Sequence, residues 1–176
     1  MREHNDRSGF KKMEFFFKIR DILFPRKRIL NEVGISEGMQ IIEFGCGPGS
    51  YTIPLSRLVG EQGKIYAVDR NPIALETTSE KLTKNKINNV TLIKTECRID
   101  LADSCIDIVL LYDVFHLLEK PAEVLSEFHR LLKPEGILSV NDHHMKNEEI
   151  TQKITESGFF DFVRLEKYSH RFIRKD

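Results

Sequence analysis

A glycine-rich turn between an apolar strand and a helix constrains this chain more than any other feature. The apolar segment 39–44 leads directly into Gly45-Cys46-Gly47-Pro48-Gly49, and residues 51–59 follow with a helical pattern that stops at Gly60. Glycines let a backbone turn sharply and let a ligand approach without an intervening Cβ. Open parallel sheets bind ligands beyond the carboxyl ends of their strands. We therefore interpret this turn as part of a binding site rather than as a plain tight turn.

Strands and helices alternate along the rest of the chain, which predicts βαβ units in an α/β fold. Strands are expected at 39–44, 64–69, 90–94, 106–112, 136–141, 160–168 and 170–175. Helices are expected at 26–33, 51–59, 72–85, 121–132 and 148–157, with a further helical piece before Pro25. Right-handed crossovers between such strands give a doubly wound, mostly parallel sheet. The last two strands are close enough to form a hairpin at one sheet edge.

Composition is that of an ordinary globular domain. The chain has 176 residues, and its 27 Lys and Arg balance its 27 Asp and Glu, so no global charge attracts nucleic acid or an acidic membrane. No apolar run approaches the ~18 residues of a membrane span, and the N-terminus lacks the apolar core of a signal peptide. We expect a cytoplasmic protein. Its three cysteines are expected to be reduced, and they contain no Cys-x-x-Cys pair that would indicate zinc.

The spacing of the glycines and a downstream acid indicate the kind of nucleotide. Dinucleotide sites favour G-x-G-x-x-G, but this chain has G-x-G-x-G with Ser50 at the next position. Asp69 closes the second sheet strand, where a carboxylate can accept hydrogen bonds from both hydroxyls of a ribose. The two features favour an adenosine ligand without a pyrophosphate and disfavour an NAD-dependent oxidoreductase.

The first motif, Ile41-Ile42-Glu43-Phe44-Gly45-Cys46-Gly47-Pro48-Gly49, resembles that of class I S-adenosylmethionine-dependent methyltransferases, and in particular the quinone-biosynthesis (methyltransferase type 11) branch. Residues 103–109 resemble the entry to that family's fourth strand, and 130–136 resemble its R-x-L-K-P-G-G stretch. The resemblance runs from about Val33 to the C-terminus. It implies a Rossmann-like sandwich with a seven-stranded, mostly parallel sheet and an antiparallel C-terminal hairpin.

The same resemblance implies S-adenosylmethionine as cofactor and S-adenosylhomocysteine as product. It assigns cofactor binding to Glu43, Gly45, Cys46, Gly47, Gly49, Asp69, Arg70, Glu96, Cys97 and Tyr112. Asp69 matches the family's ribose-binding acid. Glu96-Cys97 stands where the family has Asp-Ala, and Ile99-Asp100-Leu101-Ala102 departs from its usual Leu-Pro. For Glu43, capping of the turn's amides is the alternative to facing the cofactor's ammonium group.

Polar residues also follow the fourth and fifth strands, at the same edge of the sheet. His116 is the candidate catalytic base, because its ordinary pKa lies near neutrality; the alternative is a histidine that only packs on the next helix. Asn141-Asp142-His143-His144 is interpreted as a polar wall of the acceptor pocket. Asp142 and two adjacent histidines are a weak metal set, and we expect no metal.

Residues 1–32 are predicted to form a helical lid or arm and residues 33–176 the cofactor-binding domain. A membrane-surface helix and a dimer contact are alternatives for the first segment. The expected acceptor is a small or lipid-like molecule, and the oligomeric state is open, a dimer included. The alternatives are a non-catalytic S-adenosylmethionine-binding module, a thiol-based methylase of arsenic or another soft acceptor, and a nucleic-acid methylase. The last is disfavoured because Tyr112-Asp113-Val114-Phe115 replaces the Asn-Pro-Pro-Tyr type of motif.

Overall fold

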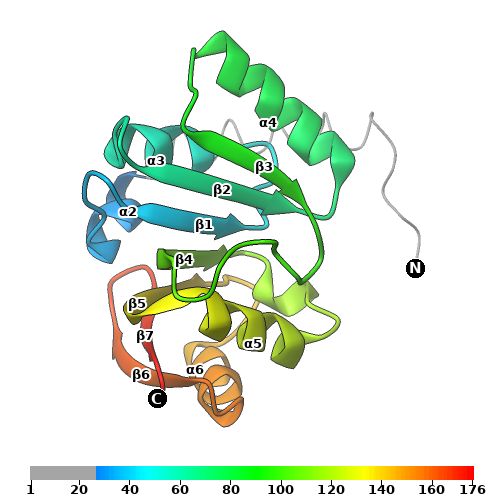
Figure 1. The fold of residues 1–176 in the computed structure, drawn as a ribbon. Helices are drawn as coiled ribbons and strands as arrows, with labels where there is room; N and C mark the ends of the chain where they lie inside the picture. The colour runs from blue at the N-terminus through cyan, green and yellow to red at the C-terminus, as the bar shows by residue number, and fades with distance from the viewer. Residues whose placement is uncertain (1–26) are drawn as a thin grey trace.

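A single seven-stranded sheet organises the protein, in the order β3-β2-β1-β4-β5-β7-β6 (Figure 1). The computed structural model describes residues 27–176. β1 to β5 pair in parallel, whereas β7 is antiparallel to both β5 and β6. The strand order reverses between β1 and β4, and such a point is where doubly wound sheets bind ligands. The predicted fold class and its antiparallel C-terminal hairpin are thus confirmed.

The helices and strands follow the predicted alternation. The strands are β1 Gln40–Phe44, β2 Lys64–Asp69, β3 Val90–Lys94, β4 Ile106–Tyr112, β5 Leu132–Asn141, β6 Phe160–Leu165 and β7 His170–Arg174. The helices are α2 Lys27–Val33, α3 Thr52–Leu58, α4 Pro72–Lys84, α5 Pro121–Leu131 and α6 Asn147–Glu156, with a 3-10 turn η1 at Phe115–Leu117.

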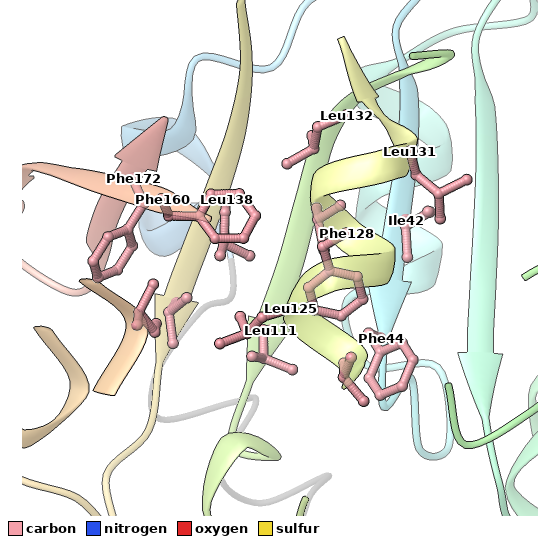
Figure 2. Close-up of a cluster of buried hydrophobic side chains, with 14 of the residues drawn as sticks. Ile42, Phe44, Leu111, Leu125, Phe128, Leu131, Leu132, Leu138, Phe160 and Phe172 are labelled. Carbon is pink, nitrogen blue, oxygen red and sulfur yellow. The ribbon is translucent and has the colours of Figure 1, made fainter. Parts of the chain in front are cut away.

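Each central strand contributes side chains to two separate cores. Ile42 of β1 joins a cluster with α5, α6 and the C-terminal strands, in which Phe128, Phe160 and Phe172 are fully buried (Figure 2). Its neighbour Ile41 joins a second cluster with α2 and α3 on the opposite face. Successive strand residues point to opposite faces, so an uninterrupted apolar strand is what a sheet covered on both sides requires.

β5 begins earlier than the predicted Gly136. Leu132 directly follows the last helical residue of α5 and pairs with Ile106, after which the register shifts before Ile137 pairs with Ile108. A Cβ on Gly136 would lie 2.8 Å from both the Leu132 side chain and the Lys133 carbonyl oxygen. β5 therefore begins directly after α5, through an irregular and tightly packed segment. The Lys-Pro-Glu-Gly sequence of this segment is typical of a turn, which is why the sequence predicted a later start.

Candidate functional site

The glycine turn lies at the carboxyl end of β1 and is pinned to the neighbouring strand. Gly45 and Cys46 both donate their amides to the Val68 carbonyl, at 2.8 and 2.9 Å. Gly45 has a φ of 81°. A Cβ there would lie 2.2 Å from Val114 Cγ2. Gly47 has a φ of 52° but open space where its Cβ would stand. Backbone strain and crowding thus demand glycine at position 45, and the open side of Gly47 lets a ligand approach.

Helix α4 holds the turn from the other side. Thr78 donates its hydroxyl to the Gly47 carbonyl at 2.9 Å, and Lys81 donates its ammonium group to the Pro48 carbonyl at 2.7 Å. Gly49 is packed against the same helix, because a Cβ there would lie 3.0 Å from Thr78 Cγ2. These anchors were not predicted from the sequence. The only available signal was the spacing of Thr78 and Lys81, which lie one helical turn apart.

Asp69 ends β2 beside the turn and joins it directly. Its Oδ2 accepts the Gly47 amide at 2.8 Å, and its Oδ1 accepts the Asn71 amide at 2.8 Å. Burial raises the pKa of Asp69, although the two amides and the Arg70 charge oppose that rise. Each carboxylate oxygen keeps a second lone pair for an outside donor. The orientation of this carboxylate is therefore fixed before any ligand arrives.

A cavity of about 340 Å³ opens beside Asp69. Its lining comes from the ends of β1 and β2, from the segment after β3, and from the η1 region with the start of α5; it includes Gly45, Asp69, Arg70, Thr95, Glu96, Cys97, Val114, Leu117 and Leu118. The lining also carries the carboxylates of Glu96, Glu119 and Glu123. A mostly apolar slot with the Asp69 carboxylate at the end of β2 suits a purine base joined to a ribose. The residues present thus fit the adenosine part of S-adenosylmethionine. Leu117 and Leu118 were missed because η1 carries no strong sequence signal.

Five of the predicted cofactor residues lie outside the lining of this cavity. Glu43 is buried, and its Oε2 accepts the Thr52 hydroxyl of α3 at 2.6 Å. Cys46 is buried, which raises the pKa of its thiol. The hydroxyl of Tyr112 shares a hydrogen bond of 2.8 Å with Ser139 within the core. The other two are Gly47 and Gly49, which belong to the glycine turn.

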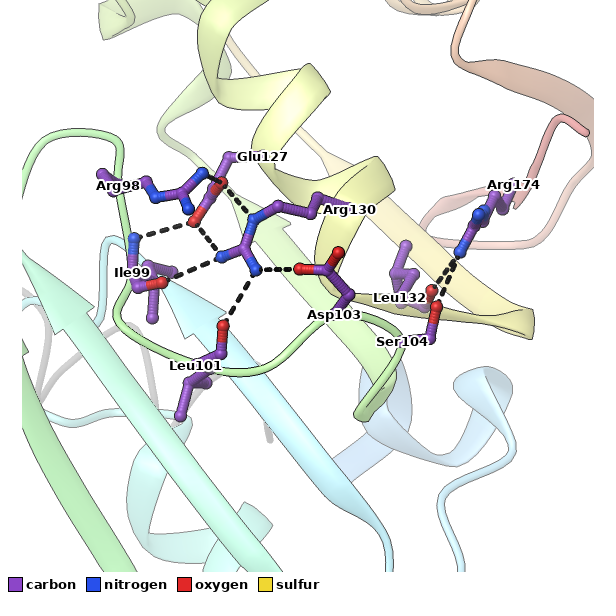
Figure 3. A network of polar contacts seen from close by, with 9 residues as sticks. All are labelled: Arg98, Ile99, Leu101, Asp103, Ser104, Glu127, Arg130, Leu132 and Arg174. Atoms are coloured by element: carbon purple, nitrogen blue, oxygen red, sulfur yellow. Dashed lines mark hydrogen bonds and ion pairs between the residues drawn. The ribbon is translucent and has the colours of Figure 1, made fainter.

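The loop after Glu96 and Cys97 is anchored by an ion-pair network around the buried carboxylate of Glu127 (Figure 3). Arg130 of α5 donates to the carbonyls of Ile99 and Leu101 at 3.0 and 2.8 Å. Glu127 accepts the Ile99 amide at 2.9 Å and two bonds from the Arg130 guanidinium, at 2.9 and 2.7 Å. This network holds one wall of the cavity against α5. The sequence marked Arg130 only as part of a resemblance and gave no partner for it.

A second polar cluster lies where β4 and β5 end side by side. The predicted wall residue Asp142 accepts a hydrogen bond from His116 Nδ1, at 2.8 and 2.9 Å from its two oxygens. His143 Nδ1 lies 2.6 Å from Asp113 Oδ1, and the His144 ring packs between those of His116 and His143 at centroid distances of 4.3 and 4.0 Å. The sequence placed these residues at one sheet edge, and the structure pairs them.

Metal-binding groups and membrane-crossing helices are absent from the part of the chain that the structure describes. Between residues 27 and 176, no three His, Cys, Asp or Glu side chains are arranged to hold a metal ion. No helix in the same range is long and apolar enough to cross a membrane. All three cysteines are free thiols. Most of the predicted N-terminal lid, residues 1–26, lies outside the described residues.

Sequence comparisons relate the chain to known methyltransferases. The model of a family described as a methyltransferase domain matches residues 35–168. The probable cobalt-precorrin-6B C(15)-methyltransferase of Sulfurisphaera tokodaii is 28% identical over 134 residues, which are 73% of this chain and 68% of that protein. A demethylmenaquinone methyltransferase of Geobacillus stearothermophilus is 25% identical over 170 residues, 96% of this chain and 68% of its own length.

A solved structure covers nearly the whole chain. It is that of an S-adenosylmethionine-dependent methyltransferase from Aquifex aeolicus, which is 30% identical and superimposes with a TM-score of 0.82. The match spans 96% of this chain and 97% of that one. The similarity therefore extends beyond the glycine turn to the sheet, the helices and the C-terminal hairpin.

Proposed function

The chain belongs to this methyltransferase domain family and is an S-adenosylmethionine-dependent methyltransferase, and we propose that it methylates a small-molecule acceptor at the β4–β5 edge of its sheet. The observation that carries the proposal is the position of the cavity. It lies at the carboxyl edge of the sheet, with the Asp69 carboxylate at its rim and the glycine turn beside it. The polar cluster at the ends of β4 and β5 lies along the same edge.

Each predicted cofactor residue has a distinct role in this proposal. Asp69 accepts hydrogen bonds from the two ribose hydroxyls, because the Gly47 and Asn71 amides already hold its carboxylate in a fixed orientation. Arg70, Glu96 and Cys97 wall the adenine, with Glu96 accepting from its amino group. The backbone of the turn, including Gly45, Cys46, Gly47 and Gly49, borders the methionine part. Glu43, held by the Thr52 hydroxyl, places a carboxylate near the methionine part of the cofactor. Tyr112 packs in the core beneath this region and is held by its hydrogen bond with Ser139.

The chemistry needs positioning more than acid–base catalysis. S-adenosylmethionine would supply a methyl group bonded to a positively charged sulfonium sulfur. After transfer of the methyl group, that sulfur is left as a neutral thioether. The chain's task is to hold the acceptor in line with that carbon–sulfur bond and to exclude water. His116 is the residue proposed to remove a proton where the acceptor carries one.

A small-molecule acceptor is supported by two observations. The names of the Sulfurisphaera and Geobacillus relatives specify a precorrin and demethylmenaquinone as their acceptors. Net charge in this chain is zero, so no overall basic character favours nucleic acid. We extend the proposal to a cytoplasmic enzyme whose N-terminal residues 1–32 cover the acceptor.

The test is calorimetric titration of S-adenosylmethionine and S-adenosylhomocysteine into the wild type and Asp69→Ala. We expect binding to the wild type and at least tenfold weaker binding to the variant, about 1.4 kcal/mol. Asp161→Ala, an exposed carboxylate on β6, is the matched control and should bind like the wild type. A folded wild type that binds neither ligand would refute the proposed site. Binding without methyl transfer to any small acceptor would instead favour the non-catalytic binding module.

A further inference from the structure

Two aspartate–histidine pairs link the loops that follow β4 and β5. The β4 loop supplies Asp113 and His116, and the β5 loop supplies Asp142 and His143. Each aspartate engages the histidine of the other loop. The two loops start level, because Tyr112 at the end of β4 pairs with Asn141 at the end of β5. The arrangement thus follows from the register of the two strands.

The two pairs differ in how completely they are enclosed. Asp142 has a fully buried side chain and His116 has 25% of its side chain exposed, whereas Asp113 and His143 have 22% and 59% exposed. Asp142 also accepts the backbone amides of His116 at 3.0 Å and His144 at 3.1 Å. The Asp142–His116 pair is therefore held rigidly, and the other pair lies closer to solvent.

Asp142 is an ionised acceptor in this setting. Burial alone would raise its pKa, but the hydrogen bonds from the His116 ring and from the two amides outweigh burial and lower the pKa below its ordinary value. A carboxylate accepts hydrogen bonds and cannot donate them. Nδ1 of His116 must therefore carry the proton, which leaves the lone pair of the neutral ring on Nε2. Nε2 has no hydrogen-bond partner among residues 27–176.

We propose that Asp142 is a positioning residue that holds His116 with its Nε2 as the proton acceptor, and that the methyl acceptor is a small molecule with a neutral hydroxyl group of the phenol or enol type. This inference rests on the proposed function. A phenol-like hydroxyl is protonated at neutral pH, with a pKa of about 10. It therefore gains from a base, whereas a thiol with a pKa of about 8.5 ionises more readily.

The transfer step balances with the groups at hand. His116 Nε2 takes the hydroxyl proton as the acceptor oxygen forms its bond to the methyl carbon. The electron pair of the broken carbon–sulfur bond goes to sulfur. The chain is left with an imidazolium whose positive charge faces the Asp142 carboxylate, and that proton passes to solvent after product release. The Asp–His orientation has the same logic as in serine hydrolases, where the aspartate fixes the tautomer of the base.

The decisive measurement is nitrogen NMR of the His116 ring in the full-length protein without ligand. We expect the neutral wild type to carry its proton on Nδ1. Asp142→Asn should shift the proton to Nε2, because an asparagine amide can donate to Nδ1. Asp113→Asn is the matched control: it removes the carboxylate of the other pair and should leave His116 unchanged. A wild-type His116 protonated on Nε2, or an Asp142→Asn variant with the wild-type tautomer, would overturn the positioning role.

A second measurement tests the acceptor class with radiolabelled S-adenosylmethionine. The probes are 1,4-dihydroxynaphthalene, catechol and, for comparison, thiophenol. We expect methylation of a hydroxyl probe, with kcat about 100-fold lower in Asp142→Asn and KM within threefold. Asp161→Asn, which changes an exposed carboxylate on β6, should retain the wild-type kcat. Methylation of thiophenol alone, or of no probe, would overturn the acceptor class.

Controls separate this inference from the proposed function. Asp142→Asn should bind S-adenosylhomocysteine like the wild type. A loss of turnover without a loss of binding in this variant would then report on the base. Failure of the wild type to bind S-adenosylhomocysteine would instead refute the proposed cofactor site. If Asp142→Asn fails to fold, His116→Ala replaces it in the assay: we expect a similar loss of turnover and partial recovery on adding imidazole. An active His116→Ala enzyme would contradict the role of His116.

Discussion

Two buried carboxylates, Glu127 on α5 and Asp142 after β5, use similar hydrogen bonds for different ends. Glu127 is held by guanidinium groups and one amide, and Asp142 by an imidazole and two amides. In both, hydrogen bonds lower the pKa against the opposing effect of burial. The partners differ in chemistry, because arginine stays charged in proteins and histidine gains or loses a proton near neutral pH.

That difference separates a structural network from a site suited to proton transfer. The guanidinium of Arg130 donates hydrogen bonds to Glu127, to Asp103 and to two loop carbonyls, so every one of its nitrogens has a partner (Figure 3). His116 uses only Nδ1 and its backbone amide within the described residues. The Glu127 carboxylate therefore stabilises a loop, because the donors of its partner Arg130 are all used in hydrogen bonds. The Asp142 carboxylate can orient a reactive group, because its partner His116 has a second ring nitrogen that makes no hydrogen bond within the described residues.

Arg130→Leu should produce the largest loss of stability. The substitution leaves the buried Glu127 carboxylate with the exposed Arg98 as its remaining charged partner. Loss of one partner of a buried ion pair typically costs about 3–5 kcal/mol of unfolding free energy. Urea denaturation followed by circular dichroism measures the loss. The double variant Glu127→Met/Arg130→Leu should recover most of it, because no buried charge then remains. A single variant as stable as the wild type would show that the network contributes nothing to folding.

Acid should reduce the stabilisation that Glu127 and Asp142 each provide. Substituting each residue in turn should show at which pH its contribution is lost. Because their folded-state pKa values are lowered, their stabilisation is complete above the unfolded values of 4.5 for Glu127 and 3.8 for Asp142 and is lost as pH falls through the folded ones. Urea unfolding at a series of pH values should therefore give a shallower acid dependence for Glu127→Gln than for the wild type. In Asp142→Asn the flattening should begin at lower pH. Parallel curves for all three proteins would contradict the stated origin of the pKa shifts.

Arg98→Met should have the smallest effect. Arg98 also contacts Glu127, at 3.1 Å, but 74% of its side chain is exposed. Exposed ion pairs contribute about 0–1 kcal/mol, and salt weakens them. Thermal unfolding at low and high ionic strength would measure the difference. A loss as large as that of Arg130→Leu would mean that exposure does not distinguish the two arginines.

Most of the fold was predictable from the sequence, for identifiable reasons. Apolar runs such as 106–112 are long enough for strands buried on both faces, and the glycines mark the turns between elements. The start of β5 was not predictable, since Lys133-Pro134-Glu135-Gly136 has the composition of a turn and is extended only because Leu132 pairs with Ile106. The η1 turn was also missed; it is too short to show a helical period.

The candidate site divides along the same line. The sequence by itself determined that Gly45 to Gly49, Asp69, His116 and Asp142 all lie at the carboxyl edge of one sheet, because each follows or ends a predicted parallel strand. Only the tertiary structure decided that Asp142 meets His116, 26 positions away, and that Arg130 closes the loop behind Glu96. Local patterns fix which strand a residue follows, but strand order and register decide which loops are neighbours, and those depend on how the whole sheet packs.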